Sequence, residues 1–161
     1  MANFELITFI NADPDLVFDL SRSIDLHIIS TGKTRERAIA GVVKGVIGKG
    51  EFVTWQAEHL FKTRSFTSVI TAFDFPHSFT DEMSRGDLKH FSHRHSFEKQ
   101  GIGTVMTDSV NLKAPYGVLG KLVMALFLKQ YFIKLMTERN MIIKEYAENG
   151  KGEMILKQYQ D

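Results

Sequence analysis

The chain has 161 residues, of which 43% are hydrophobic and 24% are charged, and its formal net charge is +1. This length is typical of one domain. The near-neutral charge argues against a nucleic-acid partner, because phosphate recognition needs a basic surface. The lack of cysteine excludes disulfides, thiolate zinc sites and cysteine nucleophiles. Thirteen phenylalanines accompany one tryptophan and four tyrosines, which indicates an aromatic interior.

The first fifty residues predict one strand and two short helices. Residues 4–10 alternate in the manner of a strand, and Asp13 followed by Pro14 is typical of a helix start. A second helical segment is predicted before Thr31. Residues 33–50 carry glycines that indicate turns and a short edge strand. No cationic segment followed by an apolar one opens the sequence, so we expect no secretory signal and a cytoplasmic location.

From residue 51 the hydrophobic pattern predicts an antiparallel meander followed by a long helix. Successive segments up to residue 112 alternate with period two and are separated by turn residues. The pattern then becomes helical from Pro115 to about Glu148. Lysines interrupt its apolar run, so no transmembrane segment is predicted. Residues 149–161 are expected to form a mobile tail, which leaves a single domain over residues 1–148.

The most informative segment is the strand that contains two histidines. Phe91, His93, His95 and Phe97 project to one face of this strand, and the serines between them project to the other. Because phenylalanine favours the interior, the histidine face is predicted to point inward.

The next strand carries a carboxylate on its apolar face. Asp108 lies there among apolar neighbours, where an unpaired carboxylate would be costly. A two-residue turn at residues 100–101 would place His93 opposite Asp108 and His95 opposite Met106. The predicted register therefore gives the buried carboxylate an imidazole partner.

A third histidine is expected inside, because His59 shares a strand face with Trp55. Imidazole is the commonest transition-metal ligand, and an i, i+2 pair on a strand can chelate an ion. Plain alternation produces the same spacing, and hydrogen-bonded polar groups in a cavity account for it equally well. We therefore assign neither a metal nor another cofactor.

A catalytic interpretation of the same residues stays open. His93 with Asp108 can form a general base that activates water, and the pair can equally be structural. Ser92 and Ser96 point away from the histidines, which disfavours a nucleophilic triad within this strand. Arg139, near the end of the long helix, is interpreted as a solvated charge.

The element order and several segments together resemble one superfamily. It is the START/Bet v 1-like (SRPBCC) superfamily with its helix-grip fold, and within it a bacterial ligand-binding subgroup labelled polyketide-cyclase-like or cell-division-inhibitor-like. The resemblance covers residues 3–148. It is carried by residues 50–59, 79–82, 93–97, 103–108 and 115–120 and by Arg139.

The resemblance implies an α+β fold with a deep cavity. A curved antiparallel sheet of about seven strands would surround a long C-terminal helix, with two short helices after the first strand. Members of the superfamily mostly bind hydrophobic small molecules, and some catalyse cyclisation or hydrolysis in the cavity.

Our leading hypothesis is an intracellular binding protein for a lipid-like or polyketide-like molecule held between the sheet and the C-terminal helix. A cyclase or hydrolase that uses His93 and Asp108 is one alternative, and a protein–protein adaptor with a filled core is another. The small molecule is the only partner predicted, and no homo-oligomer is predicted. The expected ligand-binding residues are Trp55, His59, His93, His95, Met106, Asp108, Leu122 and Leu126.

Overall fold

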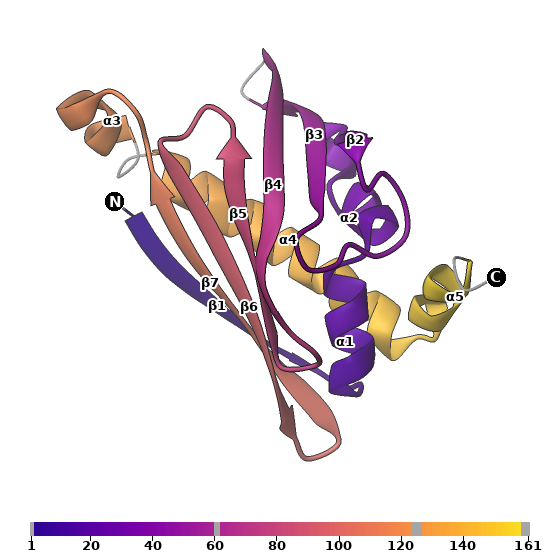
Figure 1. Cartoon of the computed structure of the whole chain (residues 1–161). Coiled ribbons are helices and arrows are strands. Elements are labelled where there is room, and N and C mark those ends of the chain that lie inside the picture. Colours follow the sequence, from indigo (N-terminus) through magenta and orange to yellow (C-terminus); the bar gives the residue numbers. More distant parts are fainter. Residues whose placement is uncertain (1, 60–61, 124–126, 159–161) are drawn as a thin grey trace.

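A computed structural model describes residues 2–59, 62–123 and 127–158. These residues contain seven strands in one antiparallel sheet, in the order β1-β7-β6-β5-β4-β3-β2, which curves around a long helix (Figure 1). This is the helix-grip architecture that the sequence predicted. The strands are β1 (Ala2–Ile10), β2 (Arg37–Gly41), β3 (Phe52–His59), β4 (Lys62–Asp74), β5 (Ser78–Arg85), β6 (His90–Gln100) and β7 (Gly103–Lys113).

Two short helices follow the first strand, as predicted. Pro14 begins the first of them, where its missing N–H costs no hydrogen bond. Ser23 caps the second by accepting a hydrogen bond from the backbone N–H of Leu26. The helical segments are α1 (Pro14–Ser21), α2 (Ile24–Ser30), the 3-10 turn η1 (Gly32–Thr34), α3 (Gly117–Val123), α4 (Lys129–Glu148) and α5 (Lys151–Lys157).

The C-terminal helical region differs from the prediction of one helix. It contains separate segments, and α3 lies beyond the end of the sheet while α4 crosses it (Figure 1). Leu122, which was expected to bind the ligand, belongs to α3 and is 55% exposed. Among the helices described, none combines the length and apolar character that crossing a membrane requires.

The segment after Glu148 is helical, whereas the sequence predicted a mobile tail. Gly150, with φ of 79°, forms the turn that begins α5. Gly152 and Ile155 are buried, and a Cβ added to Gly152 would lie 2.9 Å from Leu20 Cδ1. Gly152 thus allows a close approach between α5 and α1.

The phenylalanines form much of the core beneath α1. The buried Phe18 ring has its centroid 5.0–5.2 Å from four other phenylalanine rings, mostly edge to face, which is the preferred geometry for aromatic pairs. These partners are Phe73, Phe75, Phe79 and Phe97. The aromatic interior predicted from composition is therefore concentrated at the α1 end of the sheet.

The register between β6 and β7 differs from the prediction by two residues. His95, not His93, lies opposite Asp108, and Phe97 lies opposite Met106. The difference arises in the hairpin that joins the two strands. Its two-residue loop begins at Gly101, which has a φ of 59°, since a type II′ turn favours glycine at its first loop position. Moving the loop by one residue shifts every pair by two, so each side chain keeps its predicted face.

Candidate functional site: a cavity with a polar cluster on β5 and β6

A cavity of about 310 Å³ lies between the concave face of the sheet and helices α2 and α4. This volume is at the lower end of the range for small-molecule sites, about 300–1,000 Å³. Most of the wall is apolar, and a few titratable groups interrupt it. The apolar wall includes Ile24, Val53, Trp55, Phe66, Ile70, Phe79, Phe91, Phe132, Leu135 and Met136.

Two histidines of β6 form part of the wall, and a carboxylate of β7 lies behind them. His93 and His95 are almost fully buried, and Asp108 has no exposed surface. His93 Nε2 lies 2.8 Å from Asp108 Oδ1 and forms a hydrogen bond with it. His95 Nδ1 lies 2.9 Å from the same oxygen but lacks hydrogen-bond geometry. Both rings therefore turn one nitrogen toward Asp108 and the other toward the cavity side.

Asp108 also accepts a hydrogen bond from helix α4. The Nδ2 group of Asn140 donates a hydrogen bond of 2.6 Å to Asp108 Oδ2. Burial raises the pKa of Asp108, but its contacts with His93 and His95 outweigh burial and hold the pKa well below its usual range. Burial, together with the neighbouring His93, lowers the pKa of His95 to about 3. At neutral pH the site therefore contains an ionised Asp108 and a neutral His95.

A second carboxylate, which the sequence reasoning missed, lies on the cavity side of the histidines. Asp81 of β5 is paired with His93 in the sheet register. Its Oδ1 lies 3.7 Å from His93 Nδ1 and 3.9 Å from His95 Nε2. This oxygen is buried and has no hydrogen-bond partner among the described residues. Burial raises the pKa of Asp81, and the opposing effects of His93 and Arg139 are smaller.

Arg139 is the second group that was missed, because it is buried in the cavity wall and is not a solvated charge. Its Nη2 donates a hydrogen bond of 2.6 Å to the backbone oxygen of Ser21. Its Nη1 is buried and makes no hydrogen bond within the described part of the chain. Burial lowers the pKa of Arg139, and Asp108 and Asp81 oppose this effect.

The structure places the predicted site residues in different surroundings. Trp55, His93 and His95 line the cavity, and Asp108 supports the histidines from behind. Met106 is buried in the core, where its sulfur contacts Ser21 Oγ of α1 at 3.5 Å, so it does not form the cavity wall.

The remaining predicted residues are Leu122, His59 and Leu126. Leu122 is displaced from the cavity with α3. His59 ends β3, and its side chain lies outside the described part of the structure. Leu126 also lies outside the described residues. The adaptor hypothesis required a filled core, and the cavity does not fit that requirement.

No protein-family model and no curated protein matches the sequence. Solved structures do match the fold. Protein TTHA0849 from Thermus thermophilus superposes with a TM-score of 0.71 at 14% identity, over 91% of this chain and all of that one. The major latex-like protein 151 from Panax ginseng gives 0.67 at 14%, over 91% and 97% of the two chains.

A further match is the di-domain ARO/CYC protein StfQ from the steffimycin biosynthetic pathway. Its TM-score is 0.71 at 12% identity, over 93% of this chain and 51% of StfQ, so this chain spans about half of that protein. These likenesses show that the chain shares its fold, the helix-grip fold, with these proteins.

Proposed function

We propose that this chain is a binding protein, acting in the cytoplasm, for a lipid-like or polyketide-like molecule that carries an anionic group. The cavity would hold the apolar part of the molecule against Trp55 and the surrounding wall. The observation that carries the proposal is the buried Nη1 of Arg139, which has no hydrogen-bond partner among the described residues. An unpaired buried donor is costly, and an anionic ligand group would supply its acceptor.

The apolar wall supports the same proposal. A pocket that is mostly hydrophobic, with a few convergent polar groups, is the usual form of a small-molecule site. Arg139 and the histidines reach this pocket from opposite sides, since Arg139 comes from α4 and the histidines from β6. A ligand between them would therefore be oriented by its polar group.

The experiment compares decanoic acid with decanol by titration of the intrinsic fluorescence of Trp55, the only tryptophan of the chain. We expect the acid to bind more tightly than the alcohol. Arg139→Gln should weaken binding of the acid by about ten- to hundredfold, because a hydrogen bond to a charged group contributes about 1.5–3 kcal/mol. Binding of the alcohol should change little.

Lys134→Gln is the matched control, because Lys134 is an exposed cation on the same helix. It should leave both affinities unchanged. Equal affinities for acid and alcohol, or an equal loss in both variants, would contradict the proposed role of Arg139. The absence of any saturable fluorescence change would contradict the proposed cavity ligand.

A cyclase or hydrolase is the second candidate, and the hydrogen bond between His93 and Asp108 favours it. Asp108 holds the proton of His93 on Nε2, so Nδ1 is free to accept a proton from water or from a ligand. His93→Gln would then abolish hydrolysis of a p-nitrophenyl acyl ester while decanoic acid still binds. Equal loss of both would favour simple binding.

A further inference from the structure

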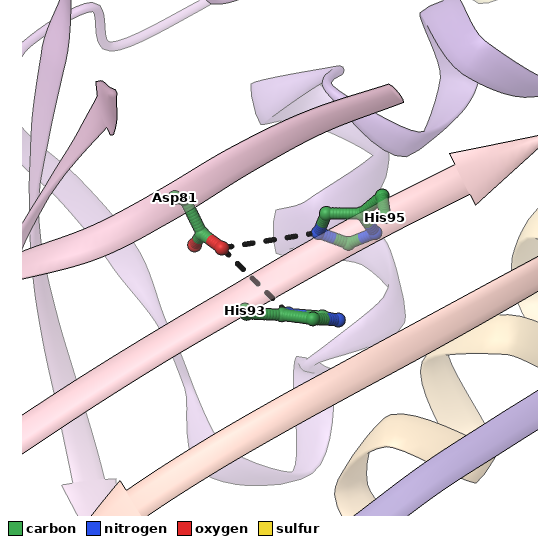
Figure 2. A group of neighbouring side chains, drawn as sticks. All are labelled: Asp81, His93 and His95. Atoms are coloured by element: carbon green, nitrogen blue, oxygen red, sulfur yellow. Dashed lines mark ion pairs between the residues drawn. The ribbon is translucent and has the colours of Figure 1, made fainter. Parts of the chain in front are cut away.

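Three potential metal-ligating atoms meet on the cavity side of the histidine pair. Asp81 Oδ1, His93 Nδ1 and His95 Nε2 all lie within 4.8 Å of one another (Figure 2). The backbone positions them, because His93 and His95 are two residues apart on β6 and Asp81 lies directly opposite His93 on β5. The arrangement therefore rests on sheet geometry and not on surface side chains.

The proton positions on the two rings favour lone pairs at this meeting point. A carboxylate accepts hydrogen bonds, so the His93 proton lies on Nε2, which faces Asp108. His95 Nδ1 lies 2.9 Å from the same oxygen without hydrogen-bond geometry, and the negative charge of Asp108 still favours the His95 proton on this nearer nitrogen. The cavity-side nitrogens are then unprotonated and face the carboxylate of Asp81. Within the described residues no hydrogen-bond donor reaches Asp81 Oδ1, so three electron-rich atoms face one another.

We propose that Asp81, His93 and His95 bind a divalent first-row transition metal ion such as Zn²⁺. Two imidazoles and one carboxylate are a ligand set that suits these ions. In a tetrahedral zinc site, ligand bonds of about 2.0–2.2 Å place the ligand atoms about 3.3 Å apart. The separations of 3.7 and 3.9 Å from Asp81 thus need to close by about half an ångström. The two histidine nitrogens lie within 4.8 Å of each other, so they need to approach by at most about 1.5 Å, which side-chain rotations supply.

The surroundings match those of a metal centre. Histidine ligands usually hold their second ring nitrogen against a carboxylate, which fixes the ring and makes the ligand nitrogen more basic. Asp108 is this carboxylate for His93, and Asn140 donates a hydrogen bond to Asp108 in turn.

Three protein ligands leave a fourth tetrahedral position for water or a ligand atom. Asp81, His93 and His95 all line the cavity, so this position faces it. The inference does not rest on the proposed function, because the ion would bind whether or not an apolar molecule is present. A bound ion would, however, give an anionic ligand group a second partner besides Arg139.

The test titrates the full-length chain, stripped with a chelator and dialysed, with Zn²⁺ alone by calorimetry and with Co²⁺ alone by visible absorption. We expect one ion per chain and a higher melting temperature with Zn²⁺. Asp81→Asn should weaken Zn²⁺ binding at least tenfold, because the amide is a much poorer ligand. This variant keeps the shape of the side chain at a position where Oδ1 makes no hydrogen bond.

His77→Ala is the control, because His77 is exposed and is not part of the cluster. It should bind Zn²⁺ as the natural chain does. His95→Gln is a second test variant, and circular dichroism checks that each variant is folded. No saturable binding to the natural chain would overturn the inference. Binding that survives Asp81→Asn and His95→Gln but falls in His77→Ala would overturn it equally. Because the titration contains no hydrophobic ligand, its failure leaves the proposed function standing.

Discussion

Two carboxylates lie on opposite sides of the same histidine pair, and their surroundings are unlike. Asp108 faces the core, has no exposed surface and accepts hydrogen bonds from His93 and Asn140. Asp81 faces the cavity, and its buried Oδ1 accepts none from any described residue. Buried polar groups are normally paired, so an unpaired one needs a reason. The contrast indicates that the core side maintains the structure, whereas the cavity side is built to receive a further partner.

The largest expected effect comes from removing the core-side carboxylate. Asp108→Ala removes the acceptor of the buried hydrogen bonds from His93 and Asn140, and it removes the carboxylate 2.9 Å from His95 Nδ1. Loss of one partner from a buried polar network costs about 3–5 kcal/mol of unfolding free energy. Urea denaturation at neutral pH measures the loss. Thr107→Ala, at the neighbouring position on the other face of β7, should change stability by about 0.5 kcal/mol at most. A loss in Asp108→Ala no larger than this would break the comparison.

Acid should weaken the fold through the same cluster. The pKa of His95 is about 3 in the folded chain, below the ordinary value of 6.5, so the unfolded chain binds more protons between these values. Stability therefore falls as the pH drops below about 6.5, by at most about 1.4 kcal/mol per pH unit. His93, Asp81, Asp108 and Arg139 are the titratable or charged groups that face His95. The depressed pKa of Asp108 adds a further loss only below about pH 4.

Urea denaturation between pH 7.5 and 4.5, with a chelator present, measures this dependence. His95→Gln cannot titrate, so its stability should vary less over this range. His77→Gln removes an exposed histidine instead and should keep the slope of the natural chain. A slope that is the same in both variants would show that the acid response arises elsewhere.

The smallest expected effect belongs to the cavity-side carboxylate. Asp81→Asn removes a negative charge that makes no hydrogen bond through its buried oxygen and lies more than 3.5 Å from each imidazole. We expect the unfolding free energy to change by less than about 1 kcal/mol, because burial already disfavours the charge of Asp81, as its raised pKa indicates, and the uncharged amide has the same shape. The same urea experiment without metal measures it. A loss as large as that of Asp108→Ala would show that both carboxylates maintain the structure.

Strand faces could be predicted from the sequence, whereas the register between β6 and β7 could not. Alternation alone places His93, His95 and Asp108 inside, because a side chain's face depends only on its own strand. The residue opposite each histidine depends on where the hairpin turns. Gly101 could occupy either loop position of the turn, and a one-residue difference moved Asp108 from His93 to His95. The hydrogen bond to His93 survives because Asp108 reaches diagonally across the strands.

The cavity-side groups were missed although each carries a signal. Asp81 lies between Phe79 and Met83 on the inward face of β5, the same pattern that identified Asp108. Arg139 follows Met136 by three residues and precedes Ile143 by four, so it belongs to the apolar stripe of α4. A charge on an apolar face is informative in both cases. That Asp81 and Arg139 lie close to the histidines of β6 depends on the tertiary fold, which no local sequence pattern encodes.

The close packing of α5 on α1 has a practical consequence for anyone who handles this protein. A chain shortened to residue 148, the boundary that the sequence pattern favoured, would lose Gly152 and Ile155 and uncover the apolar surface of Leu20. Exposed surface of this kind promotes self-association. Because α1 also adjoins the cavity wall at Ser21, affinity tags and reporters should not replace α5.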